Sequence, residues 1–283
     1  MPTNSTIISA SQALDHLQDP KWTFVDCRFN LSNPGWGHEE YQHGHIPGAV
    51  FADINKDLSG KTTSETGRHP LPNPEDFIQK VEDWGIDLHK QVVAYDHASG
   101  AYAARLWWLL QTYGHESVAV LDGGLHAWTA AGYPLAAAVE NPKKVVFDGL
   151  PDPNQWVTTH EVEAMLKDPS FMIIDARAPE RFRGEQEPID HVAGHIPGAV
   201  NHFHHENLTS DGYFLVPSQL YQAYEELIGD LPADHVIVYC GSGVTACHNL
   251  LAMEIAGLYG AKLYAGSWSE WIRNPRRPIE IGE

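Results

Sequence analysis

The sequence is poor in cysteine and in basic residues, and it has no long apolar run. Its three cysteines are too few for a disulfide scaffold and are typical of a reducing compartment. Only 18 lysines and arginines stand against 37 aspartates and glutamates, and the formal net charge of −19 argues against general affinity for nucleic acids or anionic membranes. No apolar run approaches the ~18–20 residues that span a bilayer, and residues 1–17 lack the pattern of a targeting signal. These absences predict a soluble, cytoplasmic protein that binds neither nucleic acid nor membrane.

The chain does contain an internal repeat. The segment Gly44–Val50 (Gly-His-Ile-Pro-Gly-Ala-Val) recurs unchanged as Gly194–Val200. Three further blocks recur in the same order: Val25–Arg28 as Ile174–Arg177, Val92–Asp96 as Val236–Cys240, and Gly123–Trp128 as Gly266–Trp271. A length of 283 residues suits two domains, and the ordered blocks predict a duplicated domain. We expect an N-terminal domain at 1–138, a linker at 139–156 and a C-terminal domain at 157–283.

Each half alternates short apolar runs with amphipathic segments. The runs of strand length are Thr23–Cys27, Val92–Tyr95, Val118–Leu121, Met172–Ala176, Val236–Tyr239 and Lys262–Tyr264. Asn73 is the expected cap of one helix, and Ser218 is the expected cap of its counterpart. The apolar face of that counterpart would be Leu220, Tyr224 and Leu227. This alternation predicts an α/β fold of two tandem domains, each a mainly parallel sheet flanked by helices.

Cys240 is the most informative residue. It follows a predicted buried strand and precedes a glycine-rich loop, Gly241–Thr245, which leads into a helix from Ala246 to about Ala256. In an open α/β sheet ligands bind at the carboxyl ends of the strands, and backbone N–H groups at a helix N-terminus stabilise an anion. A thiol in this position favours the thiolate, which is the nucleophilic form. Free cysteines are more often small buried apolar residues, but this context favours a catalytic one.

Together these motifs resemble the tandem-domain sulfurtransferases of the rhodanese superfamily. The shared features are an Asp-x-Arg strand end and a Gly-His-Ile-Pro-Gly-Ala box in each half, with a Cys-Gly-Ser-Gly-Val-Thr loop in the second. That loop is similar to the one of the 3-mercaptopyruvate sulfurtransferase branch, whereas thiosulfate sulfurtransferases carry Arg-Lys where this chain has Gly241-Ser242. The resemblance implies an enzyme that moves a sulfane sulfur from a small anionic donor, 3-mercaptopyruvate, through a persulfide on Cys240. The acceptor would be cyanide or a thiol, such as thioredoxin or a small thiol, and neither cofactor nor metal is implied.

The resemblance also implies a proton relay of serine, histidine and an acid. Ser242 and His45 match the catalytic serine and histidine of that relay. His195, in the second copy of the box, is the internal control, because both boxes could need a histidine merely to hold a turn. The position of the acid falls on no carboxylate, and Glu39 and Glu40 are the candidate substitutes.

Donor binding is the third property that the resemblance implies. Arg181 matches the arginine that binds the donor's carboxylate or sulfonate through paired hydrogen bonds. The family's second substrate arginine is missing, because Asp190 stands at its position, and Arg68 is the candidate replacement. The backbone N–H groups expected to hold the donor's charge belong to Gly241, Gly243, Val244 and Thr245.

Other functions stay open at this point. The donor could be thiosulfate. A Cys-dependent phosphatase or arsenate reductase would use a Cys-x5-Arg loop, but Ala246 stands where that arginine would be. A non-catalytic binding module is the state expected of the first half, where Asp96 replaces the cysteine and cannot carry a sulfane sulfur. The histidines of His202–Glu206 are not expected to bind a metal, because no matching ligands occur elsewhere.

Overall fold

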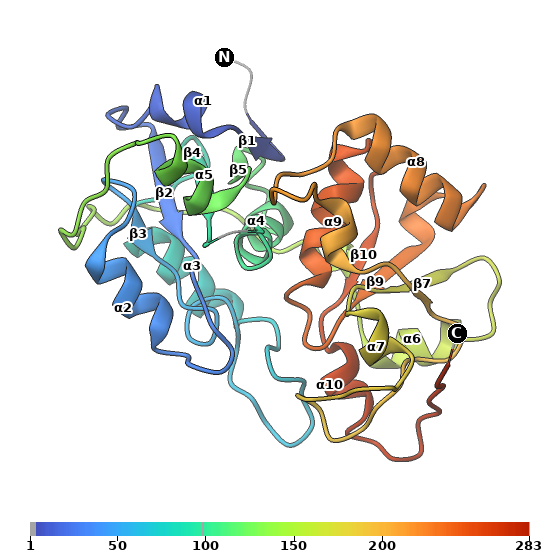
Figure 1. Cartoon of the computed structure of the whole chain (residues 1–283). Coiled ribbons are helices and arrows are strands. Elements are labelled where there is room, and N and C mark those ends of the chain that lie inside the picture. The colour runs from blue at the N-terminus through green and yellow to red at the C-terminus, as the bar shows by residue number, and fades with distance from the viewer. Residues whose placement is uncertain (1–3, 98, 283) are drawn as a thin grey trace. The chain divides into compact units, whose positions relative to one another are not determined.

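Each half of the repeat forms its own parallel sheet (Figure 1). The computed structural model describes residues 4–97 and 99–282, so Met1–Thr3 of the expected first domain and Glu283 of the second lie outside the described part. Within it, the first sheet has the strand order β1-β5-β4-β2-β3 and the second has the order β6-β10-β9-β7-β8. Every strand of one sheet therefore has a counterpart at the same place in the other. The predicted α/β class and the duplication are confirmed.

The elements of the two halves follow each other in the same sequence of strands and helices. The first half contains β1 (Ile7–Ile8), α1 (Ala10–Leu14), β2 (Trp22–Asp26), α2 (Trp36–His43), β3 (Val50–Phe51), α3 (Pro74–Asp83), β4 (Gln91–Tyr95), α4 (Ala103–Thr112), β5 (Val118–Leu121) and α5 (Gly124–Ala130). The second contains β6 (Trp156–Val157), α6 (Thr159–Met165), β7 (Met172–Asp175), α7 (Pro179–Phe182), β8 (Val200–Asn201), α8 (Pro217–Ile228), β9 (Val236–Tyr239), α9 (Ala246–Ile255), β10 (Lys262–Tyr264) and α10 (Ser267–Trp271). Short 3-10 turns lie at Pro153–Gln155, His204–Asn207 and Ala233–His235.

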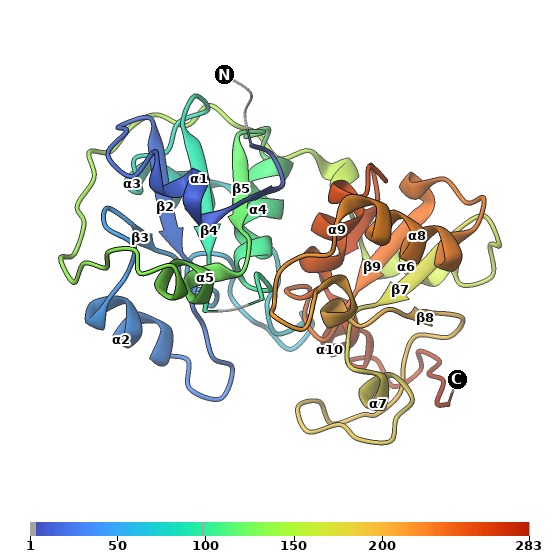
Figure 2. The same cartoon turned by 45° about the horizontal axis from the view of Figure 1, so that its top comes forward.

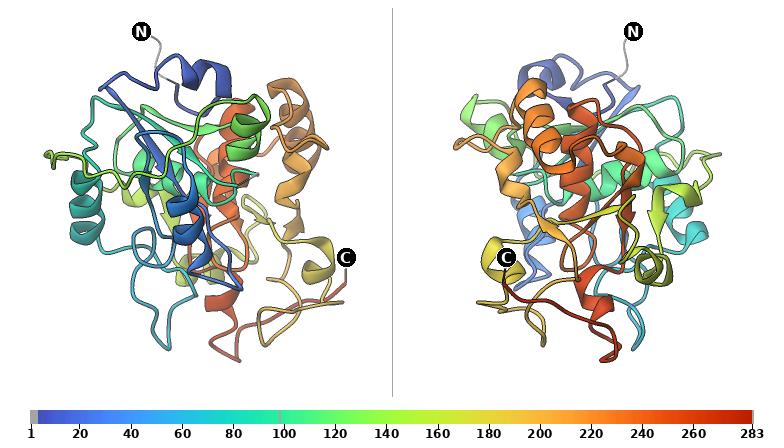
Figure 3. Two further views of the ribbon diagram at one scale, coloured as in Figure 1. Left: turned by 60° about the vertical axis from the view of Figure 1, so that its left-hand side comes forward. Right: turned by 90° about the vertical axis from the view of Figure 1, so that its right-hand side faces the viewer.

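Helices cover both faces of each sheet, as a parallel sheet requires. In the second unit, α6, α7 and α10 pack on one face through Val162, Phe182, Trp268 and Trp271, all buried against Ile173, Ile237 and Tyr239 of the strands. Helices α8 and α9 lie on the other side of this sheet in Figures 1 and 3. In the first unit, α1 and α5 contribute Ala13, Leu125 and Trp128 to one core, and β2, β4 and β5 are seen together in Figure 2. Both cores are apolar on their own, so each sheet is stabilised within its own unit.

The strand predictions were accurate because parallel strands are buried along their whole length. Three runs match β5, β9 and β10 residue for residue, Val92–Tyr95 and Met172–Ala176 differ from β4 and β7 by one residue at one end, and Thr23–Cys27 is shifted by one residue from β2. Strands β1, β3, β6 and β8 were missed, because two residues are too short to show a periodicity.

The helix predictions were right in position and wrong in one detail. Asn73 caps α3 as expected, with its side chain accepting from the N–H groups of Glu75 and Asp76. The expectation that Ser218 caps α8 is wrong: Val216 is the N-cap and Pro217 the first helical residue, because a proline at that position gives up no hydrogen bond.

The two halves exchange a loop. The first unit consists of the chain up to Gly60, Leu71–Asp152 and Ser210–Phe214, and the second of Lys61–Pro70, Pro153–Thr209 and the chain from Leu215 on. Each exchanged segment precedes a helix at the same stage of its half, α3 or α8. The division after Asp152 falls inside the segment expected as a linker, 139–156.

The described helices are short. The longest, α8, has 12 residues, and no helix within residues 4–97 and 99–282 has the length and apolar character that a membrane span requires.

Candidate active site

Cys240 is held at the carboxyl end of β9 by the first turn of α10. Its N–H donates to Ser267 Oγ over 3.1 Å, and its carbonyl accepts from the N–H of Trp268 over 2.9 Å. The four residues of β9 before it are all buried, which holds the strand end rigidly in the sheet. Only 2% of Cys240 is exposed. The thiol is therefore positioned by the fold rather than by a flexible surface segment.

Ser267 was not singled out from the sequence, and its backbone is strained. Its φ of 55° is the one positive φ of a non-glycine residue in the described part of the chain. Gly124, its counterpart in the repeat, has a φ of 58°. An L residue in this region costs about 1–3 kcal/mol. The hydroxyl of Ser267 also donates to Tyr264 O over 2.9 Å, which fixes it as the acceptor for Cys240. The sequence does hold one indication of this strain, because serine stands at position 267 where the first copy has Gly124.

The loop after Cys240 forms an anion-binding backbone. The N–H of Gly243 donates to Cys240 Sγ over 3.2 Å. Gly243 has a φ of 77°, and a Cβ there would meet Ala265 O at 2.5 Å, so only glycine fits. No described acceptor takes the backbone N–H groups of Gly241, Ser242, Val244 or Thr245. These groups and the N-terminus of α9 favour negative charge at the sulfur and beside it.

Ser242 hydrogen-bonds to a histidine that the sequence did not suggest. Its Oγ lies 2.8 Å from Nδ1 of His69, and both side chains are buried. The exchanged loop that carries His69 lies against the start of α10, with the N–H of Arg68 donating to Ser269 Oγ over 3.0 Å. A Cβ on Gly67 would meet Gly266 O at 2.5 Å, so this close approach needs glycine. The unit that carries Cys240 thus has an imidazole beside Ser242, a group that can move protons.

The two exchanged loops, Lys61–Pro70 and Ser210–Phe214, contribute different kinds of side chain to their units. Gly-Arg68-His69 corresponds to Gly-Tyr213-Phe214 in the second half of the sequence. In the first unit the N–H of Phe214 donates to Asp122 Oδ1 over 2.9 Å, and the ring of Tyr213 lies 2.7 Å from the point where a Cβ on Gly123 would be. The loop beside the cysteine therefore brings a cation and an imidazole, whereas its counterpart brings two phenyl-type rings. This difference between the copies was the signal for His69.

Arg68 and Arg181 lie beside the loop, and their roles in donor binding stay predictions. A Cβ on Gly241 would lie 2.8 Å from Arg68 Nη2 and 3.6 Å from Arg181 Nη1. Asp190 pairs with both arginines, accepting from Arg181 Nη2 over 3.0 Å. Glu187 accepts from Arg181 Nε, also over 3.0 Å. Burial alone would raise the pKa of Glu187, but the hydrogen bonds from Arg181 and from the Asp190 backbone hold it below its ordinary value.

His45 belongs to the first unit, where it is buried in the same arrangement as its repeat copy. Its Nδ1 lies 2.6 Å from Tyr41 O, and its ring stacks on Tyr41 with 4.0 Å between the centroids. His195 repeats this with Phe182, at 2.8 Å and 3.7 Å. No hydrogen bond among the described residues joins Glu39 or Glu40 to His45. Both rings thus connect their box to the helix that precedes it, and the relay role of His45 stays a prediction.

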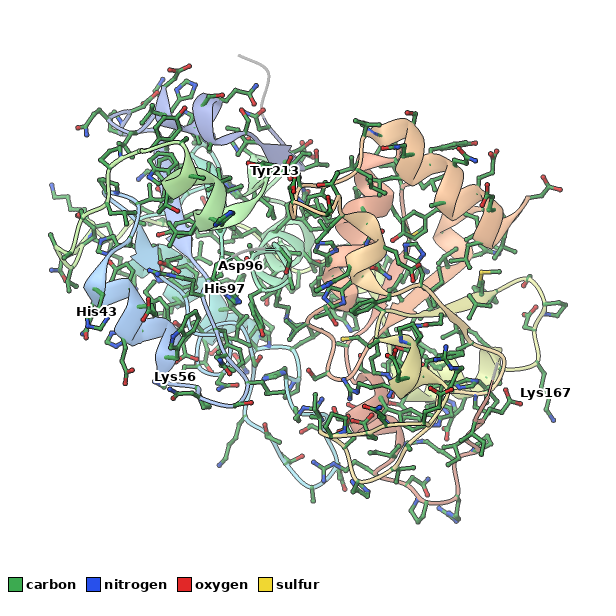
Figure 4. All side chains as sticks on the ribbon, viewed as in Figure 1. His43, Lys56, Asp96, His97, Lys167 and Tyr213 are labelled. Atoms are coloured by element: carbon green, nitrogen blue, oxygen red, sulfur yellow. The ribbon has the colours of Figure 1, made fainter. Side chains whose placement is uncertain are left out.

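In the first unit Asp96, labelled in Figure 4, stands at the repeat position that Cys240 has in the second. Asp96, at the end of β4, accepts from the N–H groups of Gly100, Tyr102 and Ala103 over 3.0, 2.9 and 3.3 Å. The loop's anion site is thus filled by the protein's own side chain. Cys27 lies in the same unit, and burial, with Asp26 and Asp96 adding to it, raises its pKa well above the ordinary value. A thiol of this kind is inert as a nucleophile.

Cys247 and the histidine-rich segment have structural partners. Cys247 is buried on α9, with Sγ 3.4 Å from Gly243 O. His202 Nε2 lies 2.9 Å from Asn207 Oδ1, and His204 Nδ1 lies 3.1 Å from Ala176 O. Burial lowers the pKa of His204 to about 4, so this imidazole is neutral. Within the described residues no group of three or more histidine, cysteine or carboxylate side chains could hold a metal ion.

Known proteins share this architecture. The model of the rhodanese-like domain matches residues 9–131 and 158–274. The chain is 47% identical over 283 residues to a probable 3-mercaptopyruvate sulfurtransferase of Pseudomonas aeruginosa, covering 99% of this chain and 100% of that protein. It is 40% identical to a putative thiosulfate sulfurtransferase of Mycobacterium tuberculosis, covering 98% and 97%. The structure of a 3-mercaptopyruvate sulfurtransferase from Leishmania major is 30% identical, with a TM-score of 0.87, over 97% of this chain and 76% of that one.

The duplicated parallel α/β fold and the relatives named as sulfurtransferases identify the chain as a sulfurtransferase. More particularly, the chain belongs to the family of proteins built from rhodanese-like domains, with two such domains in tandem.

Proposed function

We propose that this sulfurtransferase takes a sulfur atom from 3-mercaptopyruvate and passes it to a thiol or to cyanide through a persulfide on Cys240. The observation that carries the proposal is the hydrogen bond of 3.2 Å from the Gly243 N–H to Cys240 Sγ, within a loop whose neighbouring N–H groups have no described acceptor. A backbone of this kind stabilises negative charge on either sulfur of a persulfide. The relatives named as sulfurtransferases support the reaction class.

In the first step the Cys240 thiolate attacks the sulfur of the donor. An S–S bond forms while the C–S bond of 3-mercaptopyruvate breaks, and the electron pair of that bond goes to the methylene carbon as the enolate of pyruvate. The proton of the donor's thiol passes to the enolate, so pyruvate leaves and the cysteine persulfide anion remains. Ser242 and His69, 2.8 Å apart, are the groups we place on this proton path. His45 is the second histidine proposed for it.

In the second step the acceptor removes the outer sulfur. The sulfur of an acceptor thiol attacks the outer sulfur, and the S–S bond to Cys240 breaks with its electron pair returning to the cysteine as thiolate. The proton of the acceptor thiol moves to the transferred sulfur, so the acceptor leaves as a persulfide. We propose thioredoxin or a small thiol as the acceptor, with cyanide as an alternative. All three cysteines of the chain are outside disulfides, which is consistent with a cytoplasmic enzyme that uses reducing thiols.

Two guanidiniums are proposed to bind the donor's carboxylate. Arg68 Nη2 and Arg181 Nη1 both approach Gly241, the residue next to the nucleophile. A carboxylate held there by paired hydrogen bonds would place the donor's sulfur near Cys240. Gly241 itself contributes by having no side chain, because a Cβ would displace Arg68. The N–H groups of Gly241, Gly243, Val244 and Thr245 complete the proposed site.

Thiosulfate is the second candidate donor, favoured by the name of the relative that is 40% identical. Incubating the protein in turn with 3-mercaptopyruvate, thiosulfate and p-nitrophenyl phosphate, with cyanide or dithiothreitol as acceptor, separates the possibilities. We expect sulfur transfer from 3-mercaptopyruvate with kcat/KM at least ~10-fold above thiosulfate, a difference of about 1.4 kcal/mol, and no phosphate release. A higher kcat/KM for thiosulfate would contradict the choice of donor, and phosphate release without sulfur transfer would contradict the reaction class.

A further inference from the structure

A buried carboxylate lies between the two arginines proposed to bind the donor. Asp190 Oδ1 pairs with Arg68 Nη1, and Asp190 Oδ2 accepts from Arg181 Nη2 over 3.0 Å. Its side chain is only 5% exposed, against 24% for Arg68 and 15% for Arg181. Because water reaches this carboxylate poorly, its charge is weakly screened. Asp190 therefore acts strongly on any charge that enters the space beside it.

The arginine atoms that Asp190 does not use are available to a ligand. Arg68 Nη2 and Arg181 Nη1 donate to no described residue, and a Cβ on Gly241 would lie 2.8 Å from the first and 3.6 Å from the second. Arg181 Nη2, which pairs with Asp190, would also lie 3.6 Å from that Cβ. Arg68 Nε is buried and has no hydrogen-bond partner in the described part of the chain. A buried N–H donor without an acceptor costs free energy unless a ligand or water completes its hydrogen bond. One carboxylate thus pairs with both guanidiniums and leaves Arg68 Nη2 and Arg181 Nη1 without a described acceptor beside Gly241, the residue that follows Cys240.

The connected ion pairs of the site also balance in charge. Arg177 pairs with Asp175 and Glu187, Arg181 with Glu187 and Asp190, and Arg68 with Asp190. Three guanidiniums are therefore matched by three carboxylates, namely Asp175, Glu187 and Asp190. A donor that binds beside these ion pairs can accept hydrogen bonds from guanidinium N–H groups, but the ion pairs together carry no net positive charge.

We propose that Asp190 is a specificity-determining residue, whose carboxylate orients Arg68 and Arg181 and favours a monoanionic donor over a dianionic one. This inference rests on the proposed function for its meaning, because it distinguishes a keto acid of one charge from thiosulfate with two. The repulsion between Asp190 and a bound anion is proportional to the anion's charge. The unfavourable free energy is therefore twice as large for a dianion as for a monoanion. Because the dissociation constant depends exponentially on free energy, the factor by which Asp190 weakens binding of a dianion is the square of the factor for a monoanion.

The experiment compares binding of two unreactive anions, pyruvate with one charge and sulfate with two, by isothermal titration calorimetry. The proteins are the unmodified chain, Asp190→Asn, Asp190→Glu, and Glu226→Gln as a matched control. Glu226 is exposed on α8 and, among the residues that the structure describes, accepts a hydrogen bond from Gln222 alone, so the control removes one negative charge from the same unit at a surface position. Melting temperatures are measured for all four, because Asp190 is partly structural.

We expect Asp190→Asn to tighten pyruvate binding by ~3-fold and sulfate binding by ~10-fold, in line with the doubled charge. Asp190→Glu keeps the charge and should keep the preference of the unmodified chain, and Glu226→Gln should change neither constant by more than ~1.5-fold, because exposed charges are screened. Equal changes for the two anions in Asp190→Asn, weaker binding of both, or the same shift in Glu226→Gln would overturn the proposal.

Sulfur transfer by the same proteins separates this inference from the proposed function. If Asp190 acts as proposed, the ratio of kcat/KM for 3-mercaptopyruvate over thiosulfate falls by ~3-fold in Asp190→Asn. If the unmodified chain transfers sulfur from neither donor, the proposed function is wrong, and the binding constants still decide whether Asp190 selects by charge.

Discussion

The Nδ1 atom of His69 lies 2.8 Å from the Oγ atom of Ser242, although the two residues come from different halves of the repeat. The exchanged loop, Lys61–Pro70, makes this possible because it belongs to the same unit as the cysteine loop. The active unit thus depends on residues from both copies of the duplicated domain. The copy that kept Asp96 receives no equivalent imidazole, since Phe214 stands at that position of the other exchanged loop.

The first prediction distinguishes the histidines. We expect His69→Ala to lower kcat by ~10²-fold, the usual contribution of a group that transfers a proton, with a smaller effect on KM. Steady-state kinetics with 3-mercaptopyruvate measures both constants.

His45→Ala and His195→Ala are compared in the same experiment, because each ring bonds to a backbone carbonyl of the helix before its box, Tyr41 O in α2 or Phe182 O in α7. Both should lower the melting temperature. A loss of kcat in His45→Ala as large as in His69→Ala, with His195→Ala retaining its kcat at a similar melting temperature, would assign the relay to His45.

The second prediction concerns Asp96. Its carboxylate accepts three backbone N–H groups of its own loop, so Asp96→Ala leaves those donors without an acceptor. We expect a loss of ~1–3 kcal/mol in unfolding free energy, measured by urea denaturation, with kcat/KM within a few-fold of the unmodified chain. A loss of turnover beyond ~10² with little change in stability would contradict the inactive status of the first unit.

The third prediction uses the strained serine. Ser267→Gly relieves the backbone at φ 55° but removes the hydroxyl that accepts the Cys240 N–H, whereas Ser267→Ala removes the hydroxyl and keeps the strain. We expect Ser267→Gly to be the more stable of the two by about 1 kcal/mol, and both variants to lower kcat by a similar factor. Chemical denaturation and steady-state kinetics measure these effects. If Ser267→Gly had unchanged kcat, the hydroxyl would have no part in positioning Cys240.

The fourth prediction is a pH dependence of stability. Neither ring nitrogen of the buried His115 has a partner among the described residues, and burial lowers its pKa to about 4. The unfolded state, with an ordinary histidine pKa, binds the proton first, so the native state loses stability as the pH falls from ~6.5 towards 4. In His115→Phe the loss between these pH values should be smaller, as thermal denaturation at each pH can measure. An equal pH dependence in both proteins would contradict this contribution.

The repeat, the parallel sheets and the cysteine loop could be predicted from the sequence, because each is a local pattern. Buried strands appear as apolar runs, and Cys240 lies directly between one of them and a glycine-rich loop. The contact of His69 with Ser242 could not be predicted from such patterns, because it depends on a loop that belongs to the other half's unit. The strain at Ser267 could be inferred only by comparing the two copies, since serine stands where the first copy has Gly124, and serine by itself is common in caps and turns.

Arg68 could be predicted from the sequence only in part. It was a candidate because a cation was missing at Asp190, and the structure places it beside Gly241 and in an ion pair with that same aspartate. The sequence could suggest that a second cation was needed, whereas its partner followed only from the fold.

The central claim is that Cys240 carries the transferred sulfur, and intact-protein mass spectrometry after treatment with 3-mercaptopyruvate tests it most directly. We predict one added mass of ~32 Da, located on Cys240 by peptide mapping, removed by dithiothreitol and absent from Cys240→Ser. The added mass on Cys27 or Cys247, with Cys240 unmodified, would contradict the account.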